Sequence, residues 1–420
     1  MLEQSRQPAT SKSNSVRTAW ILWSILLAVV SIFILCGNTK TVTPAYRQGA
    51  TSWLQGTDLY LYEGEGFIYL PQAAVAFVPF ALLPLEASEI LWRCLIVGIF
   101  TAGLWRMASL ARREGSREFF PLMTLVCVPM VWSSMRNGQS TIPMTGLMML
   151  ATVDLADSRW WRATLWLSLA LIFKPLIIVF ALLTFALHAP MRWRLIVGAV
   201  GVFLFPFLLQ RTGYVWGQYA ACLEMFGQAN SVGNERYYAQ IFGMLRVAGI
   251  EVPSFWQNGT RALAAVATLG VCYVAKRRHS VVQTHLLLYA LAASYLMLFN
   301  PRTENNTYSH LAPALAAFFS QAFLSGQRRG LAAYYVGCAL AVLGSWELGR
   351  LFVPPAQAVW LAPLGCFAFA IPTVLDACWG KSAALADGAR QPSGATHTSA
   401  PRQIAVANTS TPASSSAAAS

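Results

Sequence analysis

Charged side chains are scarce in this sequence. Only 11% of the 420 residues are charged, and 17 of these are acidic. Soluble globular proteins carry about 25% charged residues, so the composition excludes an ordinary soluble protein. Hydrophobic residues make up 56% of the chain. We therefore predict an all-α polytopic membrane protein, built as a bundle of transmembrane helices.

Cysteine pairs and metal-binding patterns are also missing. The eight cysteines lie mostly in apolar runs, no C-x-x-C pair occurs, and the histidines lack ligand spacing. These absences exclude a disulfide framework and a zinc site, and we expect neither a metal nor a cofactor. The net charge of +13 does not indicate a nucleic-acid partner, because Lys and Arg of membrane proteins gather in cytoplasmic loops.

Long apolar runs are abundant. A bilayer core about 30 Å thick requires about 20 mostly apolar residues per helix. The first run follows basic residues, as in a signal peptide, but no small-residue cleavage site comes after it, so we expect a retained span. The sequence predicts about ten spans, at 18–37, 88–108, 119–135, 140–156, 195–210, 259–276, 282–299, 309–324, 331–349 and 356–378.

Two further apolar stretches, 66–84 and 163–187, contain prolines. If both crossed the membrane, two of the six basic clusters would lie opposite the others. The positive-inside rule therefore favours non-spanning segments and places both termini in the cytoplasm. We expect 66–84 to form an interfacial or re-entrant helix outside, and 163–187 to form a hairpin broken at Lys174-Pro175.

Composition divides the chain into three parts. Residues 1–17 form a cytoplasmic N-terminal segment, and 18–380 form the integral membrane domain. Residues 381–420 are rich in Ser, Ala, Thr and Pro. Such a segment cannot bury enough surface to become ordered, so we expect a disordered cytoplasmic tail.

The first exterior loop carries a candidate general base. Asp58 lies beside a glycine turn and is followed by Tyr60, Tyr62 and Tyr69. A carboxylate at the membrane surface can take a proton from a hydroxyl while that oxygen attacks. The alternative is that Asp58 caps the following segment or is only solvated, because Asp is a common turn residue.

A tight polar connection, Arg136-Asn137-Gly138-Gln139, lies on the same exterior face. Its side chains suit a sugar or a phosphate, and the Arg fork matches phosphate oxygens. The alternative is an ordinary polar turn. Nearby, Glu89 and Arg93 are four residues apart, which is typical of a helix-stabilising pair.

Lys174 lies in the middle of the 163–187 stretch. A lysine near the bilayer midplane is costly, so it should face a cavity or pair with another group, and such residues usually serve function. The alternative is that its side chain extends to the membrane surface.

A dense polar run, 300–310, joins two spans on the exterior side. Arg302 suits the phosphate of an anionic lipid, and the amides, including Asn306, and His310 suit sugar hydroxyls. The alternative is that Arg302 and Glu304 merely pair at the surface, which contributes little free energy. By the predicted topology this run, Asp58 and the Arg136–Gln139 turn all open on one surface, as a lipid-linked substrate would require.

The order of these elements resembles glycosyltransferase family 87, the polyprenyl-phosphate-sugar-dependent membrane enzymes of the GT-C superfamily. That family has an Asp followed by aromatics and a Y-x-P segment, then an N/G-G-Q turn and a K-P break. The matching residues here are Asp58, Tyr60, Tyr62, Tyr69, Pro71, Asn137, Gly138, Gln139, Lys174 and Pro175. Late in the chain the family has an S-P-x-x-W-x-H-like segment, and this sequence departs from that pattern. Residues 300–306 lack the tryptophan, and His310 comes later. The resemblance covers roughly 45–325.

The resemblance implies an inverting transfer of mannose or a pentose from a polyprenyl-phosphate donor to an extracytoplasmic acceptor hydroxyl. Asp58 would deprotonate the acceptor, a glycolipid or polysaccharide. Lys174 and Arg302 would stabilise the departing phosphate in place of a metal, and Arg136 and Gln139 would contact sugar or phosphate. The enzyme would reside among membrane lipids in a bacterial inner or plasma membrane, with its active site facing the extracytoplasmic side.

Two other functions compete with this one. A secondary transporter or flippase uses embedded charges and broken helices, and Lys174-Pro175 fits that description, although no matching segment occurs in another half of the chain. A lipid-binding scaffold is the third possibility, and it would leave Asp58 without a special role.

Overall fold

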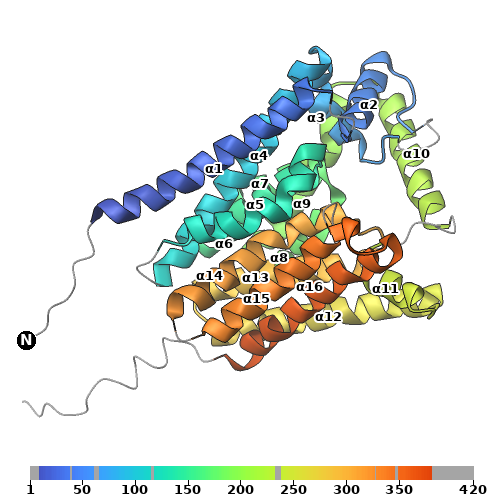
Figure 1. The fold of residues 1–420 in the computed structure, drawn as a ribbon. Helices are drawn as coiled ribbons and strands as arrows, with labels where there is room; N and C mark the ends of the chain where they lie inside the picture. The colour runs from blue at the N-terminus through green and yellow to red at the C-terminus, as the bar shows by residue number, and fades with distance from the viewer. Residues whose placement is uncertain are drawn as a thin grey trace, which may run out of the picture. The chain divides into compact units, whose positions relative to one another are not determined.

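The described part of the computed structural model consists of helices and their connections (Figure 1). It comprises residues 9–37, 40–60, 66–114, 118–231, 238–326, 328–345 and 349–380. One compact unit spans Met1–Ser382, and the predicted disordered tail lies outside the described residues. The α-helices are α1 (Ala9–Leu35), α2 (Thr43–Gln55), α3 (Pro71–Ala81), α4 (Leu85–Ala111), α5 (Phe120–Asn137), α6 (Thr141–Ala156), α7 (Trp160–Phe173), α8 (Ile178–Leu187), α9 (Arg192–Leu204), α10 (Thr212–Ser231), α11 (Ile241–Val247), α12 (Ser254–Arg278), α13 (Val281–Phe299), α14 (Ala312–Ser325), α15 (Arg329–Gly344) and α16 (Pro355–Trp379).

The all-α membrane class is confirmed, whereas the count of ten spans stays a prediction. Within the described ranges, five helical segments are long and apolar enough to cross a membrane: Asn14–Leu35, Leu85–Glu114, Ala189–Leu208, Val281–Phe299 and Val359–Trp379. Six further apolar helices have 10–17 residues. Helix α13 is the most enclosed of the five, with 83% of its apolar window buried, against 17% for Ala189–Leu208. The latter leaves its apolar side chains for lipid to cover.

The stretch 163–187 forms the expected broken hairpin. Lys174 has an extended backbone (φ −157°, ψ 126°) between α7 and a short 3-10 turn, Pro175–Ile177. The residue before a proline is disfavoured in helical conformation, and Pro175 itself lacks an N–H, so the break falls here. The chain then returns: the rings of Trp160, at the start of α7, and His188, after α8, lie 5.7 Å apart.

The stretch 66–84 contains the short helix α3. Its 11 residues rise about 16 Å, roughly half of a bilayer core. This length is compatible with the expected interfacial or re-entrant helix, which stays a prediction. The ring of Phe77 packs against Tyr46 of α2 and Trp92 of α4, at centroid distances of 5.5 and 5.2 Å.

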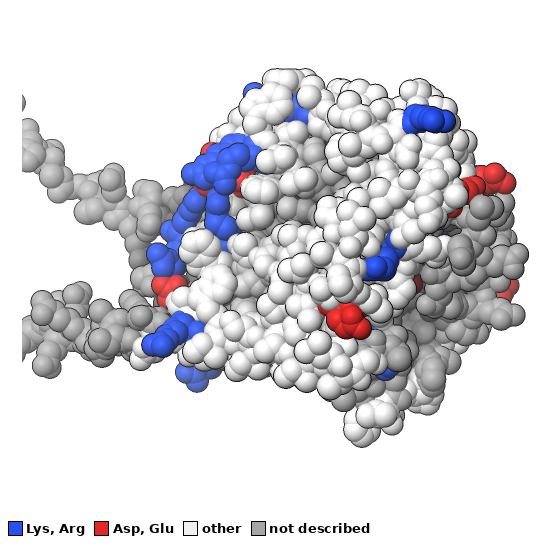
Figure 2. Space-filling view, turned by 90° about the horizontal axis from the view of Figure 1, so that it is seen from above, with Lys and Arg blue, Asp and Glu red and all other residues white. Residues whose placement is uncertain are grey.

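The basic clusters that the positive-inside rule placed together do meet at one end of the bundle. Arg113 contacts Asp157 at 2.5 Å, and Lys276 donates to the carbonyl of Leu187. Figure 2 shows Lys and Arg side chains grouped with a few acidic ones at that end. The segments that carry the candidate site residues meet at the opposite end of the bundle. There the amide of Val42 donates to the carbonyl of Asn137 (3.0 Å).

Candidate active site

The Arg136–Gln139 turn between α5 and α6 is fixed by its glycine and by α4. Gly138 adopts φ 71°, the left-handed conformation that ends α5 and that glycine adopts without a steric penalty. Its carbonyl accepts a 2.8 Å hydrogen bond from the indole of Trp92. A Cβ at Gly138 would collide with the guanidinium of Arg93.

Arg93 is fully buried and holds three segments together. Its guanidinium donates to the hydroxyls of Thr43 (2.8 Å) and Thr41 (2.9 Å) and to the carbonyl of Arg136 (2.9 Å). It also pairs with Glu89 at 3.2 Å. The predicted Glu89–Arg93 pair is therefore confirmed, but its larger role is to fasten the turn to the start of α2. Charge-assisted hydrogen bonds of this kind are about twice as strong as neutral ones.

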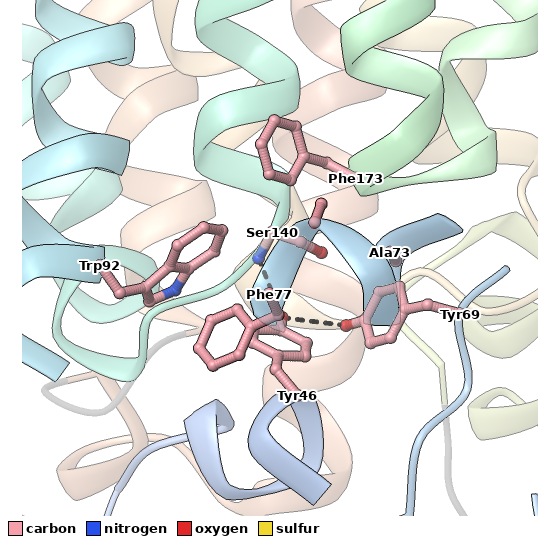
Figure 3. A pocket seen from close by; sticks show the side chains of 8 residues that line it. Tyr46, Tyr69, Ala73, Phe77, Trp92, Ser140 and Phe173 are labelled. Carbon is pink, nitrogen blue, oxygen red and sulfur yellow. Dashed lines mark hydrogen bonds between the residues drawn. The ribbon is translucent and has the colours of Figure 1, made fainter. Parts of the chain in front are cut away.

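An aromatic pocket lies beside Ser140, the residue that follows this turn (Figure 3). The hydroxyl of Tyr46 accepts a hydrogen bond from the amide of Ser140 (3.1 Å) and lies 3.1 Å from the hydroxyl of Tyr69. The pocket is lined by Tyr46, Tyr69, Ala73, Ala76, Phe77, Trp92, Ser140 and Phe173. Two phenol hydroxyls thus meet the start of α6 beside Phe173, the residue that precedes Lys174.

Lys174 lies at the N-terminus of α6. Its ammonium donates a 2.8 Å hydrogen bond to the hydroxyl of Thr141, the first residue of that helix. The N-cap Ser140 makes no capping hydrogen bond with its side chain. A helix N-terminus carries a partial positive charge, so the cation and the helix end both favour an anion at this point.

His310 is completely buried beside Lys174. The hydroxyl of Thr145 donates to the carbonyl of Thr141 (2.7 Å) and lies 2.7 Å from Nδ1 of His310. Because a hydroxyl has one proton, Nδ1 must be the donor in that second contact. In the neutral imidazole Nε2 of His310 is then an acceptor, and it has no hydrogen-bond partner in the described part of the chain.

Glu304 belongs to the same group of side chains. Its exposed carboxylate interacts electrostatically with Lys174 and with Tyr69, and Lys174 interacts with His310. The structure therefore brings together four residues singled out from the sequence: Tyr69, Lys174, Glu304 and His310. They come from three separate segments of the chain, since Glu304 and His310 both belong to the 300–310 run.

Asn306, in the same 300–310 run, makes structural contacts. The Asn306 side chain accepts a hydrogen bond from Ser133 (3.1 Å), and its backbone carbonyl accepts one from Ser134 (2.7 Å). These contacts fasten the run to α5. Arg302 is half-buried and, within the described residues, forms no ion pair with Glu304. The described structure therefore does not contain the surface ion pair between Arg302 and Glu304 that was the alternative.

Tyr60 connects Asp58 with Tyr69, which belongs to the group of side chains around Lys174. Oδ1 of Asp58 accepts a 3.0 Å hydrogen bond from the amide of Tyr60, a turn-forming contact. The Tyr60 hydroxyl then donates to the carbonyl of Tyr69 (2.7 Å). Tyr62 lies outside the described residues. Asp58 is half-buried, and burial, with its carboxylate, raises the pKa of Tyr214 on α10 to about 12.

The other predicted contacts lie in the turn itself. Gln139 is buried, with 7% of its surface exposed. The side-chain oxygen of Asn137 is buried without a hydrogen-bond partner among the described residues. The backbone carbonyl of Arg136 is held by Arg93, so at least part of this turn serves to fix the start of α6.

The family comparison decides the identity of the chain. The model of glycosyltransferase family 87 matches residues 67–301, more than half of the sequence. The chain belongs to glycosyltransferase family 87. A family 87 enzyme that resides in the membrane accounts for both the apolar helices and the polar cluster at one end of them.

Two other comparisons add little. The crystal structure of ArnT from Cupriavidus metallidurans bound to undecaprenyl phosphate is similar at a TM-score of 0.37 and 13% identity, covering 86% of this chain and 78% of that one. A similarity this low does not establish a common fold. A search of the curated proteins found no match.

Sequence reasoning missed several residues of this candidate site. Tyr46, Thr141 and Thr145 contact predicted residues, and Arg93 positions the turn. A signal was present for the threonines, because Thr141 and Thr145 are four apart just after the N-G-Q turn and share a helix face. No group of three or more His, Cys, Asp or Glu side chains is placed to hold a metal in the ranges that the structure describes.

Proposed function

We propose that this family 87 enzyme transfers mannose or a pentose, with inversion, from a polyprenyl-phosphate donor to a hydroxyl of a glycolipid or polysaccharide on the extracytoplasmic side. The observation that carries the proposal is the placement of Lys174. Its ammonium and the N-terminus of α6 form a positive site, and hydrogen bonds link Asp58 through Tyr60 to Tyr69, which belongs to the same group of side chains as Lys174.

The positive site suits the leaving group of the reaction. When the bond between the anomeric carbon and the phosphate oxygen breaks, negative charge grows on a phosphate monoester. Fixed cations and dipoles aimed at that oxygen lower the barrier. Lys174 fills this role in the proposal, and Arg302 assists it from the 300–310 run. The prenyl chain then extends along the apolar helices into lipid.

Asp58 acts as the general base in this proposal. Its carboxylate takes the proton of the acceptor hydroxyl while that oxygen attacks the anomeric carbon from the face opposite the phosphate. The 3.0 Å hydrogen bond from the amide of Tyr60 to Oδ1 fixes the orientation of the carboxylate. A turn-forming contact and catalysis are therefore compatible in one residue.

The sugar occupies the space between these two groups. Nε2 of His310 accepts a hydrogen bond from a sugar hydroxyl, which gives this buried atom a partner. The phenols of Tyr46 and Tyr69 and the carboxylate of Glu304 supply further polar contacts at the edge of the aromatic pocket.

The experiment uses the purified protein in lipid nanodiscs with radiolabelled polyprenyl-phosphate mannose or pentose and a membrane glycolipid and polysaccharide extract. Asp58→Asn retains the oxygen that the Tyr60 amide requires but cannot take a proton. Since general-base catalysis contributes about a hundred- to ten-thousandfold, transfer should fall by that range. Glu251→Gln, which alters an exposed exterior carboxylate, is the matched control.

Equal transfer by Asp58→Asn and the unaltered protein would remove Asp58 from the mechanism. A product with retained anomeric configuration, measured by NMR, would contradict direct inversion. Uptake of the donor into proteoliposomes without any transfer would instead identify the protein as a flippase.

A further inference from the structure

The end of the bundle opposite Lys174 contains a buried carboxylate shared by several donors. Asp154 on α6 is 1% exposed. It accepts hydrogen bonds from Trp166 (2.7 Å) and Arg106 (3.2 Å). It also forms an ion pair with Arg162 (3.3 Å). Arg159 lies 3.7 Å away. This aspartate therefore fixes the positions of arginines from α4 and from the start of α7.

A second aspartate extends the group but does not neutralise it. Asp157 contacts Arg113 at 2.5 Å and Arg159 at 3.7 Å. We call Arg106, Arg113, Arg159 and Arg162, with Asp154 and Asp157, the arginine cluster. Four cations surround two anions, so the cluster keeps a net charge of +2. Figure 2 shows basic side chains grouped at this end.

Much of this positive charge faces outward. The side chains of Arg113, Arg159 and Arg162 are 48–49% exposed. Arg162 contacts Asp154 through Nε, and Arg159 contacts the two aspartates through Nη1. Each guanidinium has five N–H groups, so most of theirs have no protein partner among the described residues. The arginines are held in place by the buried aspartate, which reduces the entropy lost on binding an anion.

Aromatic side chains place the cluster at the level of lipid headgroups. Trp161 is 52% exposed and Trp193 is 50% exposed. Their rings meet edge to face at 4.9 Å, and the guanidinium of Arg194 lies 4.5 Å from the Trp193 ring. Tryptophans concentrate at membrane interfaces. Leu165, one turn along α7 from Trp161, is 51% exposed and continues this face as apolar surface, as an acyl chain would require.

We propose that the arginine cluster binds the phosphodiester headgroup of an anionic phospholipid in the leaflet at this end of the protein. Planar guanidinium groups match phosphate oxygens, and the net charge of +2 favours a lipid that carries a net negative charge. A zwitterionic headgroup is disfavoured, because its ammonium would meet the arginines while both aspartates are already occupied. The proposal is independent of the transfer reaction, since the cluster and Lys174 lie at opposite ends of α7.

The test is native mass spectrometry of the full-length protein in detergent, titrated with phosphatidylglycerol or with phosphatidylcholine. We expect the protein to retain phosphatidylglycerol preferentially. The double variant Arg159→Gln/Arg162→Gln should weaken its binding about 25-fold, since each arginine that contacts the headgroup contributes about fivefold to affinity for an anionic lipid. Arg277→Gln/Arg328→Gln removes the same charge from two exposed sites at the same end and should change binding less than fivefold.

Three outcomes would overturn the proposal. Equal losses in the two double variants would mean that total charge, and not this cluster, attracts the lipid. Equal retention of the two lipids would remove the anionic headgroup as the ligand. Displacement of phosphatidylglycerol by millimolar inorganic phosphate would identify a site for a soluble anion. Single Arg113→Gln keeps the proposal testable if the double variant does not fold, and it should weaken binding about fivefold.

Discussion

The ammonium of Lys174 donates a 2.8 Å hydrogen bond to the hydroxyl of Thr141, which joins the break between α7 and α8 to the first turn of α6. A partly buried lysine among apolar helices is costly unless it has a partner or faces a polar site. That hydroxyl is neutral, and the exposed carboxylate of Glu304 interacts with the ammonium electrostatically without forming an ion pair with it within the described residues. The side chain is therefore held in position with its charge available to an anionic substrate.

Replacing Lys174 should affect turnover more than folding. Lys174→Met keeps a similar length and removes the charge. Transfer should fall about a hundred- to a thousandfold, the usual effect of removing one group that stabilises developing charge. Initial rates with radiolabelled donor measure the effect. Thermal unfolding in detergent is the control, since an apolar side chain among these apolar helices should not lower the melting temperature. A rate within threefold of the unaltered enzyme would show that Lys174 does not contact the leaving group.

Gly138 and Gly56 provide a matched pair for testing the turn. Both adopt left-handed backbone conformations, with φ of 71° and 68°. A Cβ at Gly56 meets nothing within 4 Å, whereas one at Gly138 collides with Arg93. Gly56→Ala should cost about 1–2 kcal/mol from backbone strain alone. Gly138→Ala should cost about 1–3 kcal/mol more, because the buried guanidinium loses hydrogen bonds.

The comparison is made by thermal unfolding of the two variants in the same detergent. Gly138→Ala should also reduce transfer, because the turn fixes the start of α6, while Gly56→Ala should leave transfer nearly unchanged. Equal melting temperatures for the two variants would show that Arg93 moves aside without loss.

Two native cysteines report the sidedness of the bundle. Cys36 is exposed just after α1, and Cys378 is partly exposed near the end of α16. In intact cells a membrane-impermeant maleimide should label a variant that retains only Cys36. A variant that retains only Cys378 should be labelled only after permeabilisation. The thiolate is the reactive species, so labelling is measured at pH 8. The reverse result would place the Lys174 group on the cytoplasmic side.

Much of the fold was predictable because its signals are local. Proline after Lys174 removes an N–H and disfavours helical conformation in the preceding residue. The break in 163–187 could therefore be predicted from two adjacent residues. The basic clusters indicated which loops share a side, and contacts such as Arg113–Asp157 confirm that they meet. The number of spans was less accessible, since apolar helices shorter than a bilayer are compatible with more than one depth.

The site was predicted in part. Lys174, Glu304, His310 and Tyr69 were singled out and do lie together. Asn306 fastens its segment to α5, and its expected contact with substrate stays a prediction. Arg93 was interpreted only as the partner of Glu89, because spacing along a helix shows neighbours on that helix and nothing beyond it.

The sequence by itself determined the membrane class, the break at Lys174-Pro175 and the grouping of basic loops on one side. These properties follow from composition and from the conformational limits of adjacent residues. Only the tertiary structure decided that Thr145 meets His310 across 165 positions and that Arg93 clamps Thr41, Thr43 and the carbonyl of Arg136. Such contacts depend on which helix faces pack together, and apolar helices in a membrane carry little local information about their neighbours.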